Sequence, residues 1–96
     1  MEVTIQSVNF ETSASVNEYI NKKLGKLAHH ADIRTAEVQL KVLNTTDNAN
    51  KEIGIKVQVG DEQFYASKTA AVYEDAVSQA VEALERQILK SKDKKH

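Results

Sequence analysis

Two segments of strictly alternating hydrophobicity constrain this chain more than any other feature. Apolar side chains occupy every second position of residues 36–42 and again of residues 53–59. A period of two is typical of strands that bury one face and leave the other in solvent. The mostly polar residues 44–50 between them are rich in the Asn and Asp that favour turns. The pattern therefore predicts two neighbouring strands with one shared apolar face.

The rest of the chain divides into two helices and two further strands. Residues 3–7 alternate as a half-buried strand does, and residues 16–27 carry apolar side chains at spacings of three and four, which predicts an amphipathic helix. A hydroxyl N-cap for this helix is available at Thr12-Ser13 or Ser15. After Gly60 we expect a short fourth strand with Phe64 and Ala66 on one face, and residues 73–88 have the apolar spacing of a long helix.

The resulting order is β-α-β-β-β-α, which predicts an α+β fold. The packing that buries all the apolar stripes is a four-stranded mixed sheet with two helices packed on one face. The chain has 96 residues, so we expect a single domain, residues 1–96, that ends in a basic tail, residues 90–96.

Composition narrows the environment and the chemistry. The chain contains no cysteine, which excludes disulfides, thiolate metal sites and cysteine nucleophiles. No stretch approaches the ~20 apolar residues needed to cross a bilayer, and the N-terminus lacks the pattern of a signal peptide. We therefore expect a cytoplasmic protein that makes no contact with membrane.

No motif of catalysis or cofactor binding is present. There is no Gly-rich phosphate loop, no zinc-protease motif and no nucleophile elbow. His29 and His30 are adjacent, so on a helix they point in different directions, and no third ligand lies nearby. In the last turn of the first helix they have a simpler role beside its negative dipole end. We predict no catalytic residue, no metal, no cofactor and no small-molecule substrate.

Charge is balanced overall but segregated along the chain. Thirteen basic residues stand against fourteen acidic ones, for a net charge of −1, whereas a nucleic-acid-binding domain is usually clearly basic. Residues 74–85 carry four acids and no base, while residues 90–96 carry four lysines and one aspartate. Glu74 and Asp75 suit the first turn of a helix, and Glu82 and Arg86 have the spacing of a surface ion pair.

The basic residues of the two helices lie mostly away from the apolar stripes. Lys22, Lys26 and His29 fall on the far side of the first helix, whereas Lys23 borders its stripe. On the second helix Arg86 and Lys90 fall on the outer side and are continued by Lys92 and residues 94–95. Such strips fit a polyanion, because counterion release from phosphates favours binding. They equally fit solvated helix ends that complement the macrodipole, and charge alone leaves both interpretations open.

Aromatic residues give no support to a surface for single-stranded RNA. Tyr19 and Tyr73 lie on the apolar stripes and are expected in the core, and only Tyr65 has the strand phase to face outward. One ring does not make the row of stacking platforms that such proteins use.

Several of these residues resemble a known family in collinear order. The first helix of that family carries a Tyr, a Lys and a Lys-Leu pair, which match Tyr19, Lys23 and Lys26-Leu27. Its hairpin matches residues 37–40 and 52–59. Its C-terminal Arg-Gln-Leu-x-Lys-x-Lys stretch matches residues 86–92. The chain is thus similar, from about residue 3 to residue 94, to the short ribosome hibernation-promoting factors, also called ribosome-associated inhibitor A or sigma-54 modulation proteins.

The chain also departs from the pattern of that family. It keeps Tyr73 but has Glu74 and Asp75 where the family has alanines, and it has Ala83 where the family often has lysine. These changes make the last helix less basic, which implies weaker affinity or a shifted contact surface. Nothing in the sequence corresponds to the C-terminal dimerisation domain of the long members, which implies a monomer off the ribosome.

The resemblance implies a ribosome hibernation factor rather than an enzyme. Its partner would be the small ribosomal subunit and its 16S rRNA near the decoding centre, where it would occlude the messenger and transfer RNA sites of starved or stationary cells. The alternative is a protein-interaction module that modulates transcription. Helical-wheel positions and family positions together predict six rRNA contacts: Lys22, Lys23, Lys26, Arg86, Lys90 and Lys92. Lys56 and Lys68 of the sheet are further candidates.

Overall fold

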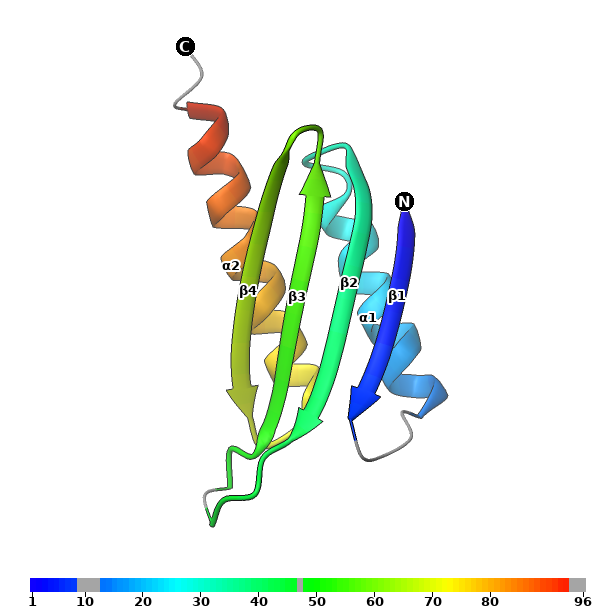
Figure 1. The fold of residues 1–96 in the computed structure, drawn as a ribbon, viewed down its shortest axis with the longest axis vertical. Coiled ribbons are helices and arrows are strands. Elements are labelled where there is room, and N and C mark those ends of the chain that lie inside the picture. The colour runs from blue at the N-terminus through cyan, green and yellow to red at the C-terminus, as the bar shows by residue number, and fades with distance from the viewer. Residues whose placement is uncertain (9–12, 47, 94–96) are drawn as a thin grey trace.

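The computed structural model describes residues 1–8, 13–46 and 48–93. Residues 92 and 93 are described by their backbone only. The elements follow the predicted order: β1 (Glu2–Val8), α1 (Ala14–Leu27), β2 (Ile33–Val42), β3 (Lys51–Val59), β4 (Glu62–Ala70) and α2 (Tyr73–Asp93). Figure 1 shows the four strands side by side, with both helices behind them. The predicted fold class, a mixed four-stranded sheet with two helices on one face, is confirmed.

The sheet has the order β1-β2-β3-β4. The two alternating segments of the sequence are hydrogen-bonded neighbours, with Val38 opposite Ile55 in an antiparallel register. β4 pairs antiparallel with β3, whereas β1 pairs parallel with β2, placing Val3 beside Ala36. The sheet is mixed because α1 carries the chain back across it between β1 and β2.

The boundaries of α1 follow from local hydrogen bonds. The Ser13 hydroxyl accepts the N–H of Val16 at 3.2 Å, so Ser13 is the N-cap, while the alternative Thr12 lies outside the described residues. The helix ends at Leu27, and the N–H groups of His29 and His30 donate to Lys26 and Leu27 in the turn that follows. The histidines therefore lie just beyond the helix rather than in its last turn.

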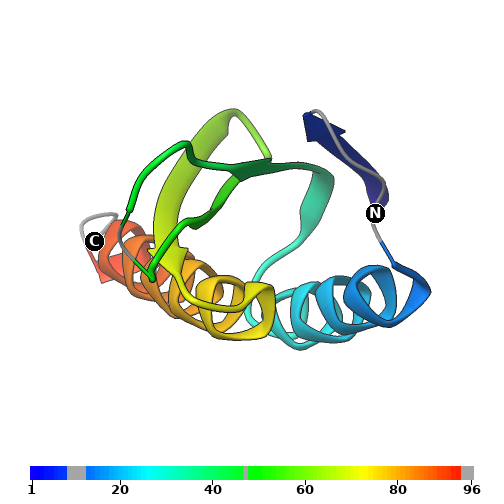
Figure 2. The same ribbon diagram turned by 90° about the horizontal axis from the view of Figure 1, so that it is seen from below.

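One core lies between the sheet and the helices. Figure 2 shows both helices packed under the same face of the sheet, which leaves the other face open. Alternate residues from Ala36 to Leu40 of β2 and from Ile53 to Val57 of β3 are buried against the apolar stripes of α1 and α2, whereas Val42 at the end of β2 is 42% exposed. Tyr19 and Tyr73 pack against this core as predicted, and burial raises the pKa of the Tyr73 phenol. The largest fully buried side chains are Ile20, Leu24, Leu27, Val38, Leu40, Ile53, Ile55, Val57, Val77, Leu84 and Ile88.

β4 is longer than the short strand predicted. It follows a tight turn in which Gly60 has φ +60°, a conformation that favours glycine, and it pairs with β3 along nine residues. The last part of β4 shows no alternation in the sequence, because Ser67, Lys68 and Thr69 are all polar and exposed at the edge of the sheet. Phe64 and Ala66 face the core as predicted, and Tyr65 faces solvent with 60% of its surface exposed.

The two edges of the sheet differ. At the β4 edge, the side-chain amide of Gln87 donates to the carbonyl of Tyr65 at 2.9 Å, and the Ser91 hydroxyl donates to Glu62 at 2.6 Å. Both bonds come from α2 and tie this strand to the helix. β1 forms the opposite edge and has β2 as its neighbour in the sheet.

Candidate nucleic-acid interface

The predicted contact residues of α1 divide into two groups. Lys22 and Lys26 are the residues on the far side of the helix, and Lys26 lies in the last turn, where a cation complements the negative end of the helix. Lys22 and Lys26 are both exposed, so both ammonium groups can reach solvent. Lys23 has its ammonium 5.4 Å from the centroid of the Tyr19 ring, within cation–π distance. Lys22 and Lys26 are therefore available to a polyanion, whereas Lys23 is already engaged within the molecule.

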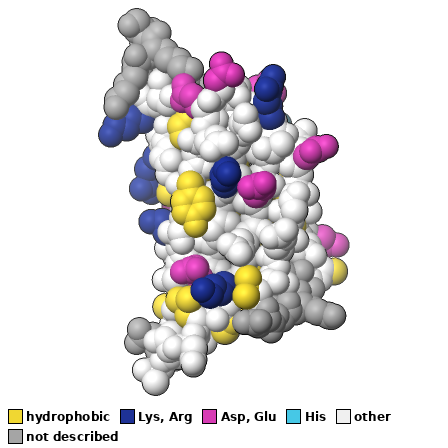
Figure 3. Space-filling view, viewed as in Figure 1, with side chains coloured by type: hydrophobic (Ala, Val, Ile, Leu, Met, Phe, Trp, Pro, Cys, Tyr) yellow, Lys and Arg dark blue, Asp and Glu magenta, His cyan; other side chains and the backbone are white. Residues whose placement is uncertain are grey.

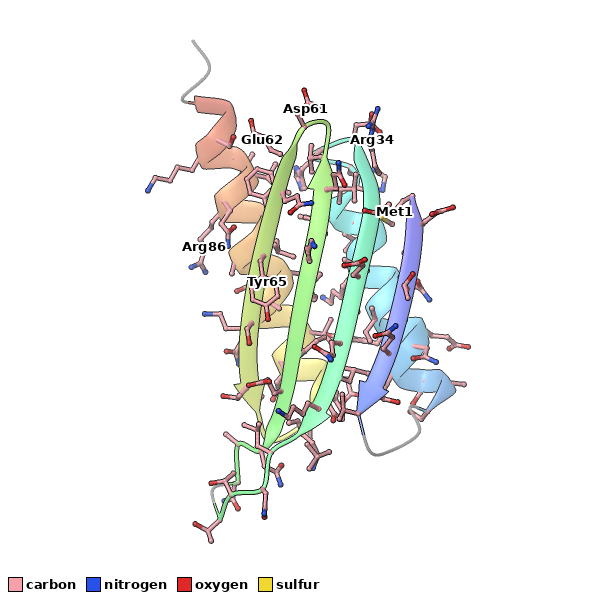
Figure 4. All side chains as sticks on the ribbon, in the orientation of Figure 1. Met1, Arg34, Asp61, Glu62, Tyr65 and Arg86 are labelled. Atoms are coloured by element: carbon pink, nitrogen blue, oxygen red, sulfur yellow. The ribbon has the colours of Figure 1, made fainter. Side chains whose placement is uncertain are left out.

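The predicted contact residues of α2 lie on its outer side. Arg86 and Lys90 are one turn apart and reach solvent, and Figure 4 shows Arg86 pointing away from the body of the protein. In Figure 3 dark blue side chains gather along the edge where α2 extends past β4. The Arg86 guanidinium lies 3.7 Å from the Glu82 carboxylate in the predicted pair, but with 79% and 66% of the two side chains exposed this contact is weak. Lys92 lies within α2, but its side chain is outside the described part, as are residues 94–96 of the predicted tail.

The two additional candidates lie on different faces. Lys68 is exposed and shares the strand phase of Ala66 and Ala70, which are buried toward the helices. Lys56 lies on the open face, where its ammonium is 3.8 Å from the carboxylate of Glu37. A single partner of the helical layer could reach Lys68 but not Lys56.

A groove of ≈ 310 Å³ separates α1 from α2 and carries charges of both signs. Glu82 and Glu85 line it together with Lys23 and Lys26, so its lysines and carboxylates balance. His30 also lies here, with its Nε2 3.5 Å from Glu85. Sequence reasoning noted the acidic run of residues 74–85 but did not place these carboxylates beside the lysines of the first helix.

A hydrogen bond between α1 and α2 links the two helices beside this groove. The Tyr19 hydroxyl and the Ser78 hydroxyl lie 2.7 Å apart across the helix pair, in a partly buried position. Together with the apolar floor of Leu27 and Val81, this bond holds α1 and α2 side by side. The helical layer thus presents two basic strips, one on each helix, with a neutral groove between them.

The described residues offer little other chemistry. Among them, no three His, Asp or Glu side chains come together as a set of metal ligands. Within the same ranges, neither helix is long and apolar enough to cross a membrane. What the helical layer can do is contact a large anionic surface through separated, solvent-exposed cations.

Comparison with known proteins agrees with this fold. Residues 3–96 match the model of the family described as sigma 54 modulation protein / S30EA ribosomal protein. The N-terminal domain of Protein Y from Thermus thermophilus superposes with a TM-score of 0.78 at 23% identity, covering 92% of this chain and 96% of that one. A ribosomal subunit interface protein from Coxiella burnetii superposes with a TM-score of 0.81 at 17% identity, covering 97% and 99%. None of the curated proteins compared with the chain matches it.

Proposed function

The chain belongs to the sigma 54 modulation protein / S30EA ribosomal protein family, and from that premise we propose that it binds the small ribosomal subunit through its helical layer. In this proposal the protein lies near the decoding centre and occupies space that messenger and transfer RNA need. Translation stops by steric exclusion, without a catalytic step.

The observation that carries the proposal is the position of the solvent-accessible cations. Lys22, Lys26, Arg86 and Lys90 all belong to the two helices that pack on the same face of the sheet. The solved structure from Coxiella burnetii, which shares this fold, is described as a ribosomal subunit interface protein. Exposed cations on a rigid helical layer suit a folded RNA, which proteins recognise largely through phosphates and shape.

The balanced net charge is compatible with this mode of binding. Each phosphate contact releases counterions locally, so affinity depends on how many cations reach phosphates rather than on the total charge of the domain. The phosphate contacts position the protein and read no sequence. Specificity for the subunit then comes from the fit of the helical layer to its RNA surface.

Co-sedimentation with purified small subunits tests the proposal. Replacing Arg86, Lys90 and Lys92 together by glutamine should weaken binding and flatten the dependence of log affinity on log salt by up to roughly 0.9 for each phosphate that no longer has a cation beside it. The matched control replaces Arg34, Lys41 and Lys51 of the β2–β3 hairpin by glutamine, which removes the same charge at another place.

The control should bind with the affinity and salt slope of the unmodified protein. If both triple variants behave alike, position on the helical layer does not matter and the proposal is wrong. If the unmodified protein remains in the supernatant at low salt, the small subunit is not its partner. A module that modulates transcription, as the first half of the family description suggests, is then the better hypothesis.

A further inference from the structure

The open face of the sheet contains a hollow to which all four strands contribute. It has a volume of ≈ 300 Å³ and lies on the side opposite the helices, at the level of Tyr65 in Figure 4. This volume is at the lower end of the range for small-ligand pockets. Its lining consists of Thr4, Gln6, Glu37, Val38, Gln39, Gly54, Lys56 and Tyr65.

The hollow exists because a glycine lies in the middle of β3. Gly54 pairs with Gln39 on one side and Ser67 on the other without any irregularity in register, so it does not mark a bulge. A glycine within a regular strand often marks a place where another group approaches the backbone closely. Here the approaching group is Tyr65, whose hydroxyl would lie only 2.7 Å from a Cβ at Gly54.

The Tyr65 side chain lies along the surface of the sheet and extends toward β3. Tyr65 is opposite Lys56 in the register, yet its hydroxyl end lies over Gly54, two residues further along β3. With 60% of its surface exposed, the side chain keeps part of its ring open to solvent beside the hollow. An open aromatic ring of this kind is a platform on which a planar group can stack.

The remaining lining is rich in hydrogen-bonding groups but carries no net charge. Thr4, Gln6 and Gln39 provide hydroxyl and amide groups that both donate and accept. The two charged residues of the lining, Glu37 and Lys56, pair with each other at 3.8 Å. The hollow therefore suits an uncharged planar group that carries several donors and acceptors.

We propose that this hollow binds one unpaired nucleobase of an RNA strand, stacked on Tyr65 and hydrogen-bonded by the glutamines. A base held in a strand keeps its phosphates outside the hollow, whereas a free nucleotide would bring its phosphate to a lining that carries no net positive charge. A duplex is too wide to enter. The inference goes beyond the proposed function, because this face lies opposite the helical layer and its ligand can be studied without ribosomes.

Nuclear magnetic resonance of the isolated full chain tests the proposal, with the single-stranded oligonucleotides hexauridylate and hexaadenylate as probes. We expect shifts of the Gly54 backbone amide and of the side-chain amides of Gln6 and Gln39. Tyr65→Ala should weaken binding about 5- to 150-fold, the range for loss of one base–aromatic stack. Tyr65→Phe should retain binding, because the ring is kept.

A second variant guards against an indirect effect. Gly54→Ala should displace the Tyr65 ring and weaken binding, while the hydrogen bond from Gln87 to the Tyr65 carbonyl still holds β4. Shifts confined to α1 and α2, or unchanged affinity of Tyr65→Ala, would overturn the proposal. Uridine or adenosine monophosphate binding as tightly as the hexamers would overturn the assignment to a strand. None of these outcomes depends on whether the small subunit is bound.

Discussion

The helical layer and the open face of the sheet are built on the same core, yet they offer opposite chemistry. The helical layer presents Lys22, Lys26, Arg86 and Lys90 on long side chains that reach into solvent. The open face presents mainly threonine, serine and glutamine, and in Figure 3 it is largely white with isolated charges of both signs around one ring. One surface suits a broad anionic partner and the other a small neutral group.

The difference follows from how each element exposes its residues. A strand sends every second side chain to the open face, where each is flanked by cross-strand neighbours, such as Glu37 beside Lys56. Opposite charges are then neutralised locally. On a helix, residues four apart are neighbours, and here they include the like-charged pairs Lys22 with Lys26 and Arg86 with Lys90, so the cations form strips. The same net charge of −1 therefore conceals two surfaces of different character.

The largest effect should come from the core that both surfaces share. Leu84→Ala removes a fully buried side chain from beneath α2 and should lower the free energy of unfolding by about 2–5 kcal/mol. Urea denaturation measures this change. Leu89→Ala, on the same helix but 43% exposed, is the control and should shift stability by no more than about 0.5 kcal/mol. Equal effects of the two changes would mean that α2 does not pack as described.

An intermediate effect should distinguish the two surfaces. Tyr19→Phe removes the hydroxyl that lies 2.7 Å from that of Ser78 and should cost about 0.5–1.5 kcal/mol, because this bond is partly buried. Tyr65→Phe removes an exposed hydroxyl from the open face and should leave stability unchanged. Combining Tyr19→Phe with Ser78→Ala in a double-mutant cycle should give a loss smaller than the sum of the single losses. Strict additivity would show that the two hydroxyls are not coupled.

The smallest effect on stability should accompany a clear effect on binding. Glu82→Gln removes an exposed ion pair and should change the free energy of unfolding by only about 0.3–0.5 kcal/mol. It also frees Arg86 and removes a negative charge from the groove between the helices, so small-subunit binding should tighten and its salt slope should steepen. Glu2→Gln makes the same charge change on β1 and should leave binding unaltered. Weaker binding of Glu82→Gln would mean that this carboxylate itself contacts the partner.

Most of the fold could be predicted from the sequence because its signals are local. Alternation in β2 and β3 and the helical spacing of α1 and α2 identify these elements, whereas the register that places Val38 opposite Ile55 is a finding of the structure. The length of β4 could not be predicted in this way. Residues 67–69 are all exposed at an edge, so no burial pattern marks them as a strand.

The candidate sites were harder to predict from the sequence, because they depend on how elements distant in the sequence pack against one another. The outward position of Lys22, Lys26, Arg86 and Lys90 follows from the helical wheel. That Glu85 lies beside His30 depends on how α1 packs against α2, and no periodicity reports that packing. The hollow over Gly54 likewise depends on the direction of the Tyr65 side chain, which extends from β4 over the backbone of β3.

The position of β1 at the open edge has a consequence for the order in which the molecule folds and opens. β2, β3 and β4 join through local hairpin connections, whereas β1 must wait for α1 to cross the sheet before Val3 can pair with Ala36. Contacts of long sequence separation form late, and an edge strand held by one neighbour opens early. Amide hydrogens of residues 2–8 should thus exchange through partial opening events in which β2, β3, β4 and both helices stay folded. We therefore expect the N-terminal strand to detach while the helical cations remain in place.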